Sequence, residues 1–195
     1  MTARKMNSLG TQHLEKYSKF LSKFEDQKIF HLGIIVQRYF YFAELQIRDF
    51  ERNCGMYFDR NNTIDYSEAC YSNSFSFYAL IRTCLEASKI LSSEIQKREK
   101  TGKLEKYRQE HFKEIKKIID IANNIVKHPQ KNPMTNKIFF YEPGGLDNFG
   151  NMGIYEWSNP HNMLKVLEIN PIKDCNVVYK YLEDLAPIYL ENISN

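Results

Sequence analysis

The chain has 195 residues, enough for one domain, with 43% hydrophobic residues and a formal net charge of +3. Thirteen Phe and thirteen Tyr, against eight Gly and six Pro, favour long uninterrupted elements around an aromatic core and argue against a loop-rich β fold. Four widely spaced cysteines without a C-x-x-C pair argue against a zinc cage, and no other metal or cofactor motif is present.

Four stretches in the first two thirds of the chain predict long helices. Apolar residues recur at spacings of three and four over residues 11–25, 28–53 and 67–98, and over a fourth stretch that begins at Leu104 and is ended by Pro129. The stretch 28–53 is apolar on more than one side, which indicates burial between neighbours. It is interrupted by charged residues, so we expect no membrane span, and the polar N-terminal residues predict no signal peptide.

The remainder of the chain predicts a small β segment and a last helix. Short strand-like runs occur at residues 137–141, 153–157 and 164–169, and Pro171 suits the first turn of a helix that extends to about Glu191. We therefore predict an all-α fold. It is a bundle of four long helices plus a C-terminal helix, in a single domain (1–195), with a small β-hairpin-like insertion near 137–169.

Positive charge is concentrated in one region of the sequence. Residues 97–137 contain twelve Lys or Arg against five Asp or Glu, whereas the rest of the chain contains fifteen against nineteen. This asymmetry would suit a surface that faces nucleic acid, and it would equally suit a solvated helix face rich in lysine.

The end of the fourth helix contains the strongest candidate site. Spacing of four residues places Asp120, Asn124 and His128 along one ridge, with Asn123 and Lys127 on the adjacent ridge. His128 could act as an acid or base near neutral pH, and Lys127 could hold a phosphate group. The alternative is that these residues only form the polar end of a helix, where Asn and cations are favoured.

The segment from Arg82 to Leu91, followed by a helix that ends in Asn-Asn-Ile-Val-Lys-His, resembles the HEPN superfamily of RNA- and nucleotide-associated helical bundles. The resemblance covers roughly residues 66–130. It implies that two protomers bring together an Arg, a polar residue and a His to cleave RNA without a metal. Asn124 matches the polar position and His128 the histidine, but Asn123 stands where the family has arginine. Asn lacks the charge and the planar donor fork of arginine, so RNA cleavage should be impaired or absent.

These observations lead to two hypotheses. The first is a HEPN-like RNA- or nucleotide-associated protein of a microbial defence or toxin–antitoxin type, possessing His128, Lys127 and Asn124 as a degenerate catalytic set. Asn123, Asp120 and Arg82 would then contact the substrate. The second is a non-catalytic helical module for dimerisation or for binding a protein partner.

Two further expectations accompany both hypotheses. Arg82 could substitute for the missing arginine, or it could form an ion pair with Glu86, four residues further along the same helix. We also expect a cytoplasmic location, with the cysteines as reduced thiols, and a homodimer, because the apolar stretch 28–53 is difficult to cover within so small a bundle.

Overall fold

The computed structural model describes residues 14–23, 25–59, 64–98, 101–126, 130–131, 138–159 and 162–192. Five helices and four strands follow one another along this part of the chain. In order they are α1 (Glu15–Leu21), α2 (Gln27–Asp59), α3 (Ile64–Gln96), α4 (Lys103–Val126), β1 (Gln130–Lys131), β2 (Ile138–Gly144), β3 (Met152–Asn159), β4 (Asn162–Ile169) and α5 (Pro171–Glu191).

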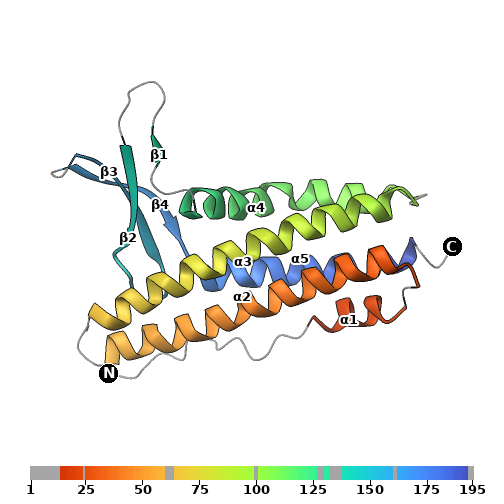
Figure 1. Ribbon diagram of the computed structural model, residues 1–195, viewed down its shortest axis with the longest axis horizontal. Helices are drawn as coiled ribbons and strands as arrows, with labels where there is room; N and C mark the ends of the chain where they lie inside the picture. Colours follow the sequence, from red (N-terminus) through yellow and green to blue (C-terminus); the bar gives the residue numbers. More distant parts are fainter. Residues whose placement is uncertain are drawn as a thin grey trace.

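The helices form an elongated bundle with the sheet at one end (Figure 1). Helices α2 and α3 run antiparallel along its whole length, and α4 and α5 pack beside them. The short α1 lies against α5 and α2 at the end of the bundle that is distant from the sheet. The sheet is inserted where α4 ends and α5 begins, so it lies close to the last turns of α4.

The core is built from the apolar stripes of these helices and is rich in aromatic rings. Two of its tyrosines satisfy their hydroxyl groups within the protein: Tyr78 donates to Oδ2 of the partly buried Asp174 at 2.6 Å, and Tyr189 bonds to Ser92 Oγ at 2.6 Å. The fully buried aromatic residues come from four different helices, which ties the bundle into one core. They are Tyr17, Phe20, Phe40, Phe50, Phe77, Tyr78 and Tyr189.

Helix α1 is held by a residue far away in the sequence. Its N-cap, Leu14, offers no side-chain acceptor. Instead, the carboxylate of Glu183 on α5 accepts hydrogen bonds from the backbone N–H groups of Lys16 at 3.1 Å and Tyr17 at 3.2 Å. Glu183 is buried, and it supplies the acceptors that the first turn of a helix requires.

The inserted sheet is a four-stranded antiparallel meander in the order β1-β2-β3-β4. The end of the sheet nearest α5 is joined to the bundle through Asn170, the residue between β4 and α5. The Asn170 side chain accepts from the N–H of Lys173, which caps α5, and donates to the carbonyl oxygen of Phe149 and to Asn151 Oδ1. Because of these contacts, the end of the sheet next to α5 has a fixed position on the bundle.

The predicted all-α bundle with a small β insertion is confirmed. Helix α5 has the predicted bounds, whereas α2 extends six residues beyond the predicted end and α1 has only 7 residues. The insertion is larger than a hairpin, since a third long strand and the short β1 join it. No membrane-spanning segment is found among the helices of the described residues.

Candidate functional site

The amphipathic pattern of α4 determines which residues reach the surface near the sheet. Its inner face places Ile118, Ala122 and Ile125 in the core. Residues on the opposite face are exposed, and they include Asp120 and Asn124 one turn apart. Because a helix repeats every 3.6 residues, the exposed ridge continues backwards through lysines of the preceding turns.

These exposed residues line a hollow of about 400 Å³ between α4 and β4, which we call the α4 hollow. Seven of its residues belong to α4, and Leu167 of β4 forms its other side. The lining residues are Phe112, Lys113, Lys116, Lys117, Asp120, Ile121, Asn124 and Leu167. The hollow thus combines three cations, one carboxylate, one amide and one exposed aromatic ring.

The lysines of the α4 hollow outnumber its single carboxylate, that of Asp120. Within the part of the chain that the structure describes, Lys113, Lys116 and Lys117 make no ion pair within 4.0 Å. Lys116 Nζ lies 5.8 Å from the centre of the Phe112 ring, a cation–π contact, and this ring is 60% exposed. The hollow is therefore a locally positive surface with an aromatic face available to a ligand.

The partly buried carboxylate of Asp174 on α5 interacts electrostatically with Lys117 of this surface. Burial raises the pKa of Asp174, and the nearby Lys117 and Lys173 oppose that rise only in part. The Tyr78 hydroxyl donates to the same carboxylate at 2.6 Å. Asp174 therefore neutralises the lysines only weakly, at a distance, and its own hydrogen bond is directed into the core.

The predicted site residues are only partly brought together. Asp120 and Asn124 share the α4 hollow, as their spacing predicted. Asn123 is half-buried and lies outside the hollow's lining. His128 and Lys127 lie outside the described residues.

Arg82 is engaged within its own helix. Its Nε donates to Glu86 Oε1 at 3.0 Å, so the predicted ion pair along this helix is confirmed. Glu86 lines a second, more apolar groove of about 420 Å³ between α3 and α4, and Arg82 lines neither this groove nor the α4 hollow. Phe112 and Lys116 line both depressions, so they form the ridge between them.

No protein-family model, curated protein or solved structure matches the chain. The interpretation of the site therefore depends on its own residues and geometry. Among the described residues, no group of three or more His, Cys, Asp or Glu side chains is placed to hold a metal ion. The donor set of the α4 hollow, three ammonium groups with one amide and one carboxylate, is suited to an anionic or polar organic ligand.

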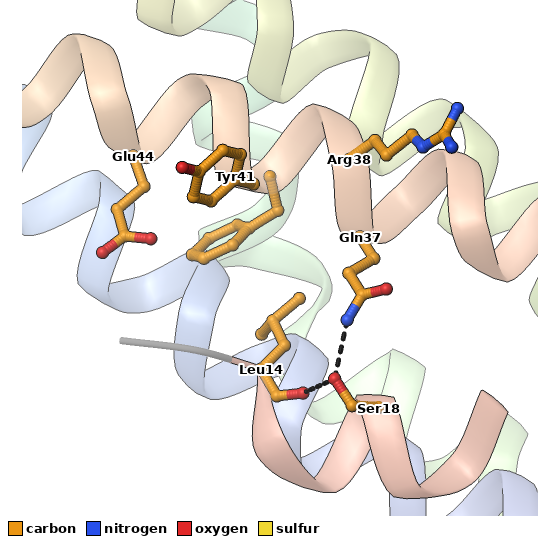
Figure 2. Close-up of a pocket in the computed structure, with 7 residues that line it drawn as sticks. Leu14, Ser18, Gln37, Arg38, Tyr41 and Glu44 are labelled. Carbon is orange, nitrogen blue, oxygen red and sulfur yellow. Dashed lines mark hydrogen bonds between the residues drawn. The ribbon is translucent and has the colours of Figure 1, made fainter. Parts of the chain in front are cut away.

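A third depression, of about 300 Å³, lies between α1 and α2 and contains none of the predicted residues (Figure 2). Its polar groups bond to one another. Gln37 Nε2 donates to Ser18 Oγ at 2.6 Å, and this hydroxyl donates to the Leu14 carbonyl oxygen at 2.8 Å. The buried Glu44 accepts from Arg48 at 2.8 Å. Figure 2 shows the Arg38 guanidinium directed away from these groups, so the depression lacks a convergent set of free donors.

Sequence reasoning found Asp120 and Asn124 but did not single out Phe112 or the three lysines. The signal was available for the lysines, because residues 113, 116, 117, 120 and 124 follow helical spacing within the basic region. Leu167 could not have been assigned to the site, because its contribution depends on where the sheet packs.

Proposed function

We propose that this protein is a HEPN-like RNA- or nucleotide-associated protein that binds single-stranded RNA at the α4 hollow. The observation that supports it most directly is the gathering of three lysines, which form no ion pair with any described residue, around an exposed phenylalanine. Single-stranded nucleic acids are held by this combination, in which cations follow the phosphates and an aromatic ring stacks on a base.

Each group in the hollow has a role in this proposal. Lys113, Lys116 and Lys117 contact phosphate oxygens, and Phe112 stacks on one base. The Asn124 amide and the Asp120 carboxylate lie one turn apart and are suited to hydrogen bonds with a base edge or a ribose 2′-hydroxyl. A rigid duplex would place its bases out of reach of Phe112, so we expect a preference for single strands.

Two matched double variants test the phosphate contacts. Lys113→Gln/Lys117→Gln and Lys19→Gln/Lys23→Gln each remove two exposed lysines four residues apart, the first pair in the hollow and the second at α1. At about 0.7 units of salt slope per contact with a single strand, losing two contacts should lower the slope by about 1.4. Binding should weaken about 25-fold at roughly 0.1 M salt. Fluorescence anisotropy with a labelled RNA of about 20 nucleotides measures both quantities.

The Lys19/Lys23 variant should bind RNA within about twofold of the wild type if the contacts are local to α4. Equal losses in the two double variants would mean that RNA responds only to net charge, and would contradict the proposed site. Replacing Phe112 with Ala should weaken binding by about tenfold. The same change at Phe149, another exposed phenylalanine, should not.

Catalysis is a separate part of the proposal. His128, Lys127 and Asn124 would act on RNA as a degenerate set, weakened because Asn123 stands in the place of an arginine. The test compares RNA degradation by the wild type with that by His128→Ala. A rate that falls in the variant supports residual cleavage, whereas equal and negligible rates would leave binding as the function.

An exposed apolar surface on α2 favours a second candidate function, homodimerisation. Phe30, Ile35, Tyr41 and Phe42 are each between 37% and 47% exposed, an unusual density of large apolar side chains on one surface helix. Light scattering should then give twice the 23.2 kDa mass of the chain. Phe42→Asp should restore the monomer, and Phe58→Asp, at a similarly exposed phenylalanine near the end of α2, should not.

The four cysteines are consistent with the reducing cytoplasm that we propose as the protein's location. All four are free and buried, and none is in a disulfide. Free thiols of this kind are common in proteins of reducing compartments.

A further inference from the structure

Two of the four cysteines lie in direct contact. Cys54 on α2 and Cys70 on α3 place their sulfur atoms 3.4 Å apart, and both side chains are buried. Cys70 Sγ also lies 3.8 Å from the carbonyl oxygen of Phe50, and Cys84 Sγ lies 3.4 Å from that of Val36. The contact between Cys54 and Cys70 thus joins two thiols across the interface of α2 with α3.

The end of α2 and the start of α3 lie at the end of the bundle that carries the sheet (Figure 1). Cys54 is five residues from the end of α2 at Asp59, and Cys70 is six residues after the start of α3 at Ile64. Ser74, one turn after Cys70, contacts Met152 Sδ at 3.7 Å, and Met152 begins β3. Helix ends open more readily than helix centres, which gives a small oxidant access to these buried thiols.

We propose that Cys54 and Cys70 are a modification site that forms a reversible disulfide when the protein meets a peroxide. A disulfide requires sulfur atoms about 2.05 Å apart, so the two side chains must approach by about 1.4 Å from their present contact. Rotation of the two side chains must close this distance. Cys84 and Cys175 serve as internal controls, because both are buried and outside the pair.

The reaction balances with hydrogen peroxide as the oxidant. A thiolate attacks one peroxide oxygen, the O–O bond breaks, and the released hydroxide takes a proton to leave as water. The resulting sulfenic acid is attacked by the second sulfur, which forms the S–S bond and loses its proton as a second water leaves. Two thiols are oxidised and one peroxide is reduced to two waters.

The contact also changes the pKa values of the two thiols. A hydrogen bond between them, in which either sulfur can donate, lowers the pKa of Cys70, although burial acts against this. The same hydrogen bond raises the pKa of Cys54, and burial raises it further. One sulfur of the pair therefore attacks the peroxide as the thiolate, and the other resolves the sulfenic acid.

Trypsin makes the test direct, because each cysteine falls on its own peptide. Cleavage after Arg52, Arg60 and Arg82 separates Cys54 (residues 53–60) from Cys70 (residues 61–82). Cys84 and Cys175 fall on two further peptides, residues 83–89 and 174–180. The folded full chain is treated with hydrogen peroxide, alkylated in denaturant and digested without reductant. The expected product is a linked 53–60/61–82 peptide that dithiothreitol separates.

A second measurement detects the consequence for the fold. The disulfide closes a loop between residues 16 apart in sequence, so the melting temperature should rise by roughly 6 °C after oxidation and return on reduction. Cys54→Ser should lose both the linked peptide and this rise, and Cys175→Ala should retain both.

Three outcomes would overturn the proposal, and all of them are read from the wild-type chain. One is complete alkylation of all four thiols after peroxide treatment. Another is the formation of disulfides among all four cysteines without preference for the Cys54–Cys70 pair, which would mean that the chain unfolds before it reacts. The last is accumulation of sulfinic acid at Cys54 or Cys70 without any link.

Discussion

The capping of α1 by Glu183 gives a prediction that can be calculated from two hydrogen bonds. In Glu183→Ala, the N–H groups of Lys16 and Tyr17 lose their shared acceptor in a largely buried place. Each unsatisfied donor costs about 1.5 kcal/mol, so the free energy of unfolding should fall by about 3 kcal/mol. Glu183→Gln retains one carbonyl oxygen and should lose about half as much. For a chain of 195 residues, the alanine variant should melt about 6–12 °C lower.

The neighbouring residue provides the control. Asp184 forms an ion pair with Lys16 at 3.7 Å, but its side chain is 37% exposed and that of Lys16 is 55% exposed. Such a surface pair contributes about 0.5 kcal/mol or less, so Asp184→Ala should be nearly neutral. Urea denaturation followed by circular dichroism measures both variants. If Glu183→Ala and Asp184→Ala have equal midpoints, the buried carboxylate does not hold α1 and the reasoning is wrong.

Other predictions concern two glycines of α2 and the carboxylate of Asp174 on α5. Gly55→Ala should raise the free energy of unfolding by about 1 kcal/mol, because the position is helical and has no atom within 4 Å of an added Cβ. Gly33→Ala should lower the free energy of unfolding by about 1 kcal/mol, because the new Cβ would lie 2.2 Å from Leu21 Cδ2. A variant whose urea midpoint equals that of the wild type would contradict the prediction made for it. Burial raises the pKa of Asp174, so its contribution to stability is fully present below about pH 4 and is lost as the pH rises through its folded pKa. In Asp174→Asn, the amide oxygen can still accept the hydrogen bond from Tyr78. The free energy of unfolding of this variant relative to the wild type, measured in urea, should increase between about pH 3 and about pH 7. A difference in unfolding free energy that is constant with pH would contradict this.

The helices could be predicted because apolar residues recur at helical spacing and residues typical of helix ends mark where the helices begin and stop. Asn170 followed by Pro171 is a strong start signal, and α5 begins at the predicted residue. The end of α2 was placed six residues too early, because Gly55 and the polar residues around it weaken the apolar pattern. Cys54 nevertheless continues the buried stripe, and its contact with Cys70 explains why the helix persists.

The sheet and the site were harder to predict for a different reason. The runs that form β2, β3 and β4 were recognised, but their extents and pairing depend on contacts between strands, which local pattern does not encode. Within the site, the ridge from Asp120 to Asn124 follows from helical spacing alone. The inclusion of Leu167 follows from where β4 lies relative to α4.

The dependence of α1 on α5 also imposes an order of assembly on the chain. The hydrogen bonds from α1 to Glu183 join residues 166 and 167 positions apart in sequence. During synthesis, Tyr17 and Phe20 leave the ribosome long before Tyr189, the ring against which both pack. Their apolar face therefore lacks its α5 partner until translation of α5 is complete. The first of the described helices to be synthesised is the last to be enclosed in the bundle.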